Sequence, residues 1–384
     1  MARTSAFRPE VRRVLPALLG LRFVSNTGGR MVFSFLPAIT RGTGLSVEEM
    51  GQILFLRDLT GLAAGRIGRV IDRWGQRKAM VGGGLLLGIG LLLAMLGPVG
   101  VLVGFVLVGF GRLSLGISMT AWIGDEVAYA QRGRATGLVE LTWAGAALIG
   151  VPICGVLIDV FNWWTPFLVL GVATIGFSLA QGEIADHRAS STIDGRPNRL
   201  HLSRSTIAAL SAPALLLSGA TMLFFGHGTW LEEVYDFNAT RIGFAVITVG
   251  LAEFGGSYGS SWLTDRLGKR QSILGGSALM LVAVIGLAIA PEAHIVVGLG
   301  LLLTAFLGFE FAIVSSIPLM SELDTDARAR MVGLSIGVKS VARATAALLA
   351  GWVDQNYGFE VLAAISAVLV ATSMVVMLAV SAEY

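Results

Sequence analysis

Ionisable and amide side chains occur inside several long apolar stretches of this sequence, where a charge is costly. A charged side chain at the centre of a membrane-spanning helix costs about 2.5–3.5 kcal/mol on insertion scales, so such residues indicate a functional site by default. The chemistry open to them is the binding of a charged solute or the transfer of protons through buried carboxyl groups. The residues concerned are Arg22, Asn26, Arg30, Arg57, Asp58, Arg112, Glu140, His227, Glu253, Glu310, Lys339 and Arg343.

The spacing of these residues predicts shared helix faces. Arg22, Asn26 and Arg30 follow one another at intervals of four, which places them on one face of a helix. Lys339 and Arg343 have the same spacing. Six basic residues stand against four acidic ones, so the interior would carry a charge near +2 if all were ionised. The arginine-rich face of the first span, together with Arg112, motivates an organic anion as an alternative solute.

Two acidic residues have alternative roles. Arg112 and Glu140 are predicted to lie at the same depth on neighbouring helices and could pair. The pair would be either a proton-coupling element or a static salt bridge that fixes the helix register. For Glu253 we favour a structural pair with Lys339 or Arg343, because a buried carboxylate needs a partner or a proton.

Four further side chains allow more than one interpretation of their surroundings. Arg57 and Asp58 are about 100° apart on a helix, so we expect each to have a different partner. His227 either responds to protons in the cavity or is simply hydrogen-bonded, as a lone histidine near a helix end usually is. Trp143, one turn from Glu140, could face either the cavity or lipid.

A charged motif occurs twice between apolar stretches. The residues Asp72–Met80 read DRWGQRKAM, and Asp265–Ile273 read DRLGKRQSI. The offset of 193 residues (265 − 72) is close to half of the 384-residue chain. A second pair of similar stretches, RGRATGL at 132–138 and RARMVGL at 328–334, has an offset of 196 (328 − 132). Two motifs in nearly one register predict two homologous halves, 1–182 and 205–384, joined by a polar linker at 183–204.

The elements that carry these residues are predicted to be membrane-spanning helices. The chain is 54% hydrophobic and only 14% charged, with 50 glycines, whereas a soluble domain has about 25% charged residues. A spanning helix needs about 20 mainly apolar residues. Twelve stretches qualify: 14–37, 48–70, 79–96, 99–121, 135–158, 163–182, 205–230, 242–264, 271–290, 294–317, 329–352 and 359–380. We therefore predict an all-α integral membrane protein of two pseudo-symmetric six-helix bundles.

The distribution of lysine and arginine predicts the orientation. With the N-terminus in the cytoplasm, 18 of these residues fall in cytoplasmic segments and only Arg41 and Arg241 fall in segments on the external side. The others lie within or at the edges of the spans. This asymmetry places both termini and the linker in the cytoplasm of a multi-pass protein of the cell membrane. The net charge of +3 is small and its basic residues lie in separate clusters, so we exclude nucleic acid as a partner. We expect a lipid bilayer as the surroundings and a monomer.

Several activities lack the residues they need. No phosphate-binding Walker A sequence and no protease or hydrolase motif occurs, and no polar domain is large enough for soluble chemistry. The single cysteine, Cys154, makes a thiolate metal site improbable. We therefore expect no enzyme activity, no cofactor and no metal.

The first charged motif resembles the signature loop of the major facilitator superfamily. This resemblance implies alternating access between two six-helix bundles, with the loop as a conformational latch. Asp72 would face the start of the eleventh span or pair with Arg134. The alternative is that the loop only fixes the orientation of the helices in the membrane and has no gating role. The latch residues implied are Gly68, Asp72, Arg73, Gly75, Arg77, Lys78 and Arg134, with Asp265, Arg266, Gly268 and Arg270 in the second copy.

The fifth span contains AGAALIGVPICG, with Gly150, Pro152 and Gly155. It resembles a motif of the antiporter branches of that superfamily, although Val151 stands where the motif has glycine. The resemblance favours proton-coupled export of small organic compounds, with protons as the coupling ion. The alternative is transport of small organic anions by the intramembrane arginines, and a remote third is a non-transporting membrane sensor or scaffold.

Overall fold

The computed structural model describes residues 7–183, 203–322 and 328–380, and these parts are helical without any strand. Most of the N-terminal half is built from α1 to α9, with two short 3₁₀ helices, η1 and η3, and one π-helix, η2. The bounds are α1 Pro9–Ser34, α2 Leu36–Thr43, α3 Val47–Leu59, η1 Thr60–Ala63, α4 Ala64–Trp74, α5 Gln76–Leu93, α6 Pro98–Glu126, α7 Tyr129–Gly145, η2 Ala146–Gly150, α8 Val151–Val160, α9 Thr165–Leu179 and η3 Ala180–Glu183.

The C-terminal half has five long helices. They are α10 Arg204–Tyr235, α11 Ala239–Leu267, α12 Lys269–Ile289, α13 Ile295–Glu322 and α14 Arg328–Met377. Gly358 interrupts α14 with φ 77° and ψ −175°, so that α14 comprises two helices. Each of the twelve expected spans thus coincides with helical structure, in some cases divided by a short 3₁₀ or π segment. Seven helical segments among the described residues are long and apolar enough to cross a membrane by themselves.

Local sequence signals explain several helix ends. Ser46 and Glu49 form a reciprocal capping box at the start of α3, which satisfies backbone N–H groups that lack partners within the helix. Gly75 and Gly268 have nearly the same backbone conformation, φ 93° and 86° with ψ 152° and 147°. Side chains disfavour this conformation, so the glycine of each charged motif permits the tight turn between two spans. The repeat seen in the sequence is therefore also a repeat in backbone geometry.

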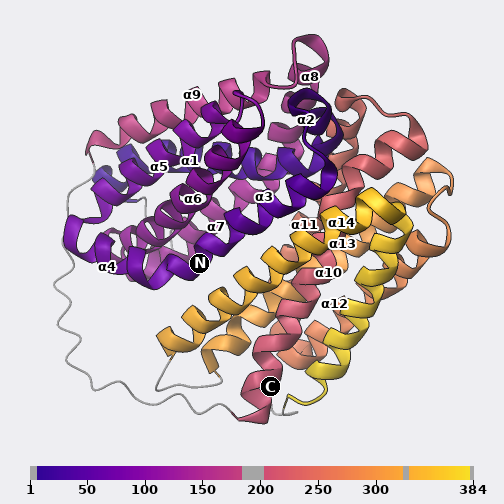
Figure 1. Cartoon of the computed structure of the whole chain (residues 1–384). Helices are drawn as coiled ribbons and strands as arrows, with labels where there is room; N and C mark the ends of the chain where they lie inside the picture. The colour runs from indigo at the N-terminus through magenta and orange to yellow at the C-terminus, as the bar shows by residue number, and fades with distance from the viewer. Residues whose placement is uncertain (1–6, 184–202, 323–327, 381–384) are drawn as a thin grey trace.

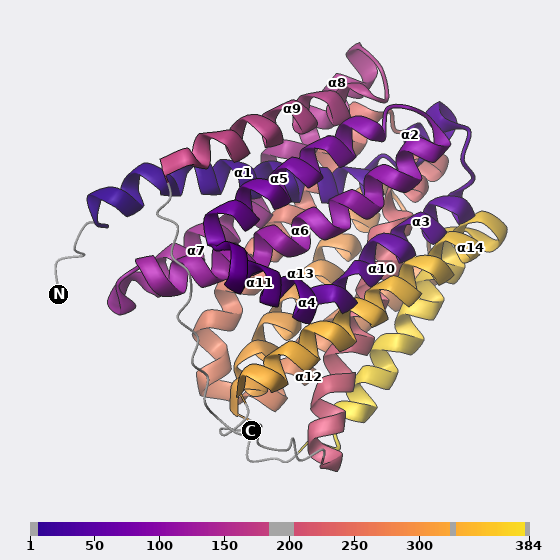
Figure 2. The ribbon, with the colours of Figure 1, turned by 60° about the vertical axis from the view of Figure 1, so that its left-hand side comes forward.

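The helices form two bundles that meet at one end and diverge toward the other. Helices α1 to α9 make up one bundle and α10 to α14 the other (Figure 1). The bundles approach each other around α2, α8 and α14 and separate toward α4 (Figure 1), and Figure 2 shows the same molecule turned by 60°. We call these the contact end and the splayed end.

Direct bonds hold the contact end together. Arg41 forms an ion pair with Glu232. The Glu48 backbone N–H donates to the Gln355 side chain at 2.9 Å. The Thr240 N–H donates to the Asp159 carboxylate at 2.8 Å. All three bonds join one bundle to the other, so this end is closed by polar contacts as well as by packing.

Candidate functional site

A buried ion pair joins the two bundles in the middle of the molecule. Arg30 on α1 donates to the carboxylate of Glu253 on α11, and the two side chains are 5% and 1% exposed. The Arg30 guanidinium also lies over the ring of Trp143 on α7, 3.9 Å from its centroid, as in a cation–π contact. Sequence reasoning predicted Lys339 or Arg343 as the partner of Glu253, and this prediction was wrong. The spacing along one helix cannot show which bundle supplies the partner.

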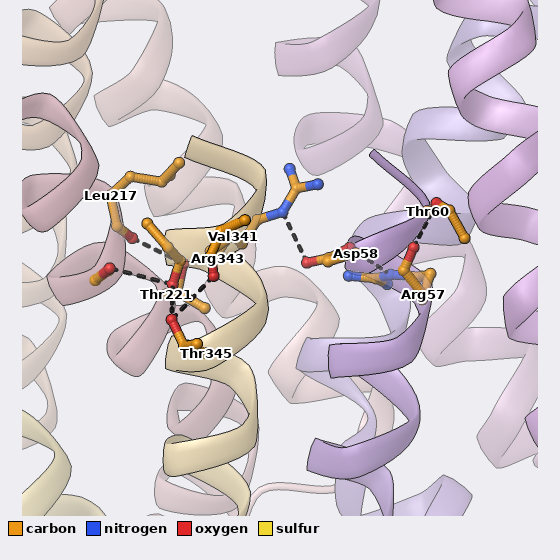
Figure 3. A network of polar contacts seen from close by, with 10 residues as sticks. Arg57, Asp58, Thr60, Leu217, Thr221, Val341, Arg343 and Thr345 are labelled. Carbon is orange, nitrogen blue, oxygen red and sulfur yellow. Dashed lines mark hydrogen bonds and ion pairs between the residues drawn. The ribbon is translucent and has the colours of Figure 1, made fainter. Parts of the chain in front are cut away.

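A second buried carboxylate, Asp58, is shared by two arginines (Figure 3). Arg57 donates through Nε to Oδ1 at 2.9 Å, and Arg343 on α14 donates through Nε to Oδ2 at 2.7 Å. The expectation that Arg57 and Asp58 have different partners was therefore wrong in part. The arginine side chain is long enough to fold back onto its neighbour, and Asp58 has an additional partner in the other bundle.

A helix break positions this pair. The α-helix ends at Leu59 and continues as the 3₁₀ helix η1, and the Thr60 hydroxyl donates to the Arg57 carbonyl at 2.6 Å. A 3₁₀ stretch inside a longer helix often marks a functional hinge. The break lies where the charges of α3 face α14.

Arg112 on α6 is held against the backbone of α1. Its Nη1 donates to the Ser25 carbonyl at 3.0 Å. A carbon added at Gly29 would lie 1.9 Å from this nitrogen, so only glycine leaves room for the guanidinium. In the described part of the chain, no ion pair joins Arg112 to Glu140. Glu140 instead lies close enough to Arg22 for their charges to interact.

Several arginine side chains lie close enough together for their charges to interact. The guanidinium of Arg112 interacts electrostatically with Arg22, Arg57 and Arg343, and with Asp58 as the only carboxylate among these partners. Lys339, half-buried one turn before Arg343 on α14, lies on the same helix face. Within this neighbourhood the positive charges outnumber the negative ones.

An acidic pocket lies beside this basic neighbourhood. It has a volume of about 210 Å³ and is formed by α7, α11 and α13. Three carboxylates, Glu140, Glu253 and Glu310, line it, and Ser257 donates to Glu310 at 2.7 Å. Trp143 and Tyr258 contribute aromatic surface to the wall. Carboxyl groups in a small, partly apolar pocket are suited to proton exchange or to binding a cation.

Two of the predicted residues serve as hydrogen-bond links. His227 is buried, its Nδ1 lies 2.8 Å from the Phe224 carbonyl and its Nε2 lies 3.2 Å from the Ser34 hydroxyl. It thus links α10 to α1, in keeping with the hydrogen-bonded alternative. Asn26 donates to the Thr142 hydroxyl at 3.0 Å and links α1 to α7.

The first charged motif lies at the splayed end. Asp72 is exposed, and no described residue pairs with it. Arg134, the expected partner, lies over the Phe7 ring at 5.0 Å. A side chain at Gly68 would meet nothing within 4 Å, so this glycine does not serve a close helix contact in this conformation. The other predicted partner, the free N–H groups at the start of the eleventh span near Arg330, stays a prediction, because residues 323–327 directly before that start lie outside the described residues.

Other residues of the two motif copies contact their own bundle. Gln76 donates to Asp125, joining the motif to α6. In the second copy, Arg266 lies over the Trp262 ring at 4.4 Å. Arg270 donates to the Leu378 carbonyl at 3.0 Å. The side chains of Asp72, Arg73, Lys78, Asp265 and Arg266 are exposed.

The fifth-span motif forms part of the interface between bundles. Residues 146–150 adopt a π-helix directly before Pro152, and such bulges occur frequently at functional sites. A carbon added at Gly155 would lie 2.4 Å from the Ala239 carbonyl oxygen, and one at Gly150 would lie 2.2 Å from the Thr27 hydroxyl. These glycines allow close approach to α11 and α1.

Sequence reasoning missed the residues that position the charged side chains. Gly29, Thr60 and Ser257 are uncharged, and nothing in their local sequence distinguishes them from other small residues of a membrane helix. Only the three-residue spacing between Thr60 and Arg57 could have indicated a helix-end hydrogen bond.

The fold and the charges between the bundles define a class: a helical membrane protein of two bundles with polar residues between them. The sequence places the chain within that class. Residues 18–334 match the Major Facilitator Superfamily profile, and the chain belongs to this family. The family and the relatives that are named transporters point to a transporter rather than an enzyme.

Sequence relatives include bacterial transporters. The chain is 25% identical over 230 residues to the uncharacterised MFS-type transporter YceJ of Bacillus subtilis, covering 58% of each chain. It is 26% identical over 183 residues to a second such protein, YwfA, covering 45% of this chain and 44% of that one. It thus spans only about half the length of these two relatives. It is 24% identical over 370 residues to the gentisate transporter of Corynebacterium glutamicum, covering 88% of this chain and 81% of that one.

Solved structures share the fold. A bacterial homologue of the human lysosomal transporter Spinster, in an inward-facing and occupied conformation, has a TM-score of 0.72 at 13% identity and covers 97% of this chain and 95% of its own. A bacterial homologue of the iron transporter ferroportin, in an inward-facing state, has a TM-score of 0.72 at 15% identity, covering 96% of this chain and 98% of its own. At these identities the likeness establishes the fold alone.

Proposed function

We propose that this protein carries small organic anions across the cell membrane by alternating access, with protons as the coupling ion. The observation that carries this proposal is the surplus of positive charge between the bundles. Arg30 is balanced by Glu253, but Asp58 alone serves both Arg57 and Arg343. Arg112 has only a backbone carbonyl as its hydrogen-bond partner in the described part of the chain. A buried positive charge without a counter-ion is unfavourable, and a bound anion would supply that counter-ion.

One sequence relative supports an anionic substrate. The similar protein of Corynebacterium glutamicum is named a gentisate transporter, and gentisate is a small aromatic carboxylate. The match extends over most of both chains. We propose the same chemical class, a small organic carboxylate, for the present protein.

The proposed coupling ion is the proton, and the acidic pocket supports it. Glu310 has a hydroxyl partner, Ser257, and no basic partner in the described part of the chain. A carboxyl group in such surroundings can exchange a proton with solvent as the pocket opens and closes. Protonation of Glu310 would thereby depend on conformation, which is the requirement for coupling.

The conformation supports an alternating-access cycle. We propose that the splayed end faces the cytoplasm, together with both termini and the linker at 183–204, in a monomer whose halves span 1–182 and 205–384. In that orientation the structure would be inward-facing, with its latch disengaged. Asp72 would engage the start of α14 or Arg134 when the splayed end closes, because a helix N-terminus favours a nearby carboxylate.

A second candidate function is proton-coupled export of organic compounds that are neutral or cationic. The acidic pocket favours it, because Glu140, Glu253 and Glu310 are combined there with Trp143 and Tyr258. Carboxylates and aromatic rings together are typical of sites that bind organic cations. The interface position of Gly150, Pro152 and Gly155 accords with the resemblance to antiporters.

Transport assays in proteoliposomes distinguish the two candidates. Uptake and efflux of labelled gentisate, benzoate and an organic cation such as tetraphenylphosphonium are measured with and without an imposed pH gradient. We expect carboxylate transport that responds to the gradient, and loss of at least 90% of it in Arg112→Gln. Transport of the cation alone would favour the second candidate. Carboxylate transport that is indifferent to pH would exclude proton coupling.

A further inference from the structure

The guanidinium of Arg343 has an occupied edge and a free edge. Its Nε donates to Asp58 Oδ2 at 2.7 Å, and the side chain is 45% exposed although Asp58 is only 4% exposed. The two terminal nitrogens point away from Asp58, and no bond is drawn to them (Figure 3). An arginine has five N–H donors in a planar fork. The described residues therefore leave most of this fork available.

Both oxygens of the carboxylate that holds Arg343 already accept a hydrogen bond. Asp58 Oδ1 accepts from Arg57 and Oδ2 from Arg343. Arg57 is buried at 8% exposure, with its guanidinium 5.5 Å from the Phe33 ring centroid. Asp58 and Arg57 thus fix Arg343 in position without using its outer edge, much as one carboxylate orients a side chain for a second ligand.

A second arginine from the other bundle lies in the same neighbourhood. Arg112 on α6 has a charge that interacts with that of Arg343. It is fixed by the Ser25 carbonyl and by the absence of a side chain at Gly29. Asp58 is bonded to Arg343 and its charge also acts on Arg112, but Asp58 is shared with Arg57, so a further anion near both guanidinium groups would offset their remaining repulsion.

We infer that Arg343 and Arg112 bind the carboxylate of the transported anion, with Arg343 presenting its free Nη edge in a bidentate contact. This inference rests on the proposed function and names the residues and the ligand group within it. Planar forks match carboxylates in a way that lysine cannot reproduce. The apolar body of the ligand would lie among the aromatic side chains nearby, including Phe33.

The inference also gives a reason for the substrate to affect conformation. Arg343 belongs to α14 and Arg112 to α6, so a carboxylate bound to both ties the two bundles together in addition to Asp58. A ligand shifts a conformational equilibrium only through different contacts in the two states. A bridging carboxylate makes such a difference whenever the two arginines move apart.

The test uses the purified full-length protein and three probes of similar shape: benzoate, benzenesulfonate and the neutral benzamide. We expect benzoate to bind and benzamide not to bind, as measured by calorimetry in detergent. Arg343→Lys keeps the charge but loses the fork, and we expect it to weaken benzoate binding at least tenfold. Arg112→Lys should have a similar effect. Arg241→Lys, at an exposed position on α11, is the matched control and should bind as the wild type does.

Each outcome separates this inference from the proposed function. If wild-type protein binds and transports carboxylates but Arg343→Lys binds benzoate with unchanged affinity, the assignment to Arg343 is wrong while the function stands. If the wild type binds no anion, the function itself fails. If benzenesulfonate and benzoate bind equally well, and both lysine variants lose affinity for the two probes equally, the site recognises any anion. The proposed bidentate contact with a carboxylate would then be wrong. Melting temperatures of all variants establish whether a loss of binding arises from unfolding.

Discussion

Arg30 and Glu253 illustrate how a buried ion pair constrains a membrane protein. Both side chains are almost fully buried and belong to different bundles. Among the described residues, the Arg30 Nε and Glu253 Oε1 atoms have no hydrogen-bond partner, so the pair is only partly satisfied. Removing one partner of such a pair usually costs more than removing both, because a lone buried charge remains.

We therefore expect Glu253→Gln to destabilise the protein by about 3–5 kcal/mol, the usual cost of breaking a buried pair. The double variant Arg30→Met with Glu253→Leu should recover most of this loss. Thermal unfolding in detergent, followed by light scattering, would measure both changes. Equal destabilisation of the single and double variants would contradict the interpretation.

At the same scale, Glu310 is the proposed proton-exchanging group. We expect Glu310→Gln to abolish the response of transport to a pH gradient, because the glutamine amide does not ionise. Substrate exchange at equal pH should continue. Counterflow in proteoliposomes measures exchange separately from gradient-driven transport. Ser257→Ala, which removes the hydroxyl donor but keeps the carboxyl group, is the matched control and should retain gradient-driven transport.

At the scale of elements, the contact between α3 and α14 depends on the absence of side chains. A carbon added at Gly51 would lie 2.9 Å from the Ala347 carbonyl oxygen and 2.9 Å from the Gly351 Cα. Both contacts are tighter than van der Waals distance, so the two helix backbones touch directly. This contact lies near the Glu48–Gln355 bond and helps to close the contact end.

We expect Gly51→Val to disfavour closure of the contact end by about 1–3 kcal/mol, the usual cost of overpacking. The shift should appear as increased labelling of a cysteine introduced at Glu48. Gly65→Ala serves as a control, because a side chain there would meet nothing within 4 Å. Unchanged labelling in Gly51→Val would mean that the helices can yield at this point without opening.

At the scale of the whole molecule, the proposed alternating-access cycle requires the contact end to open. Glu48 and Gln355 approach each other across the bundles, so cysteines at these positions should be joined by a short bifunctional thiol reagent. We expect cross-linking to abolish transport and cleavage of the linker to restore it. The two single-cysteine variants should transport normally after the same treatment. Transport that persists in the cross-linked protein would contradict alternating access through this end.

The features that could be predicted from the sequence are those that depend on residues close together along the chain. The period of apolar residues marked the spans, and Gly75 and Gly268 marked two turns, because these signals depend on a few consecutive residues. The division of the second span at Thr60 and the π-helix at 146–150 escaped prediction. Both depend on packing against other helices, and that packing overrides the local preference for a continuous α-helix.

The sequence by itself determined the class of protein, the positions of its helices, the internal repeat and the set of buried charges. Each of these follows from composition, periodicity or motif, and the family match agrees with the class of protein. Only the tertiary structure decided the pairings, with Glu253 bonded to Arg30 and Asp58 to two arginines. A charge identifies the kind of partner that it needs, but the partner itself is chosen by which helices the fold brings face to face.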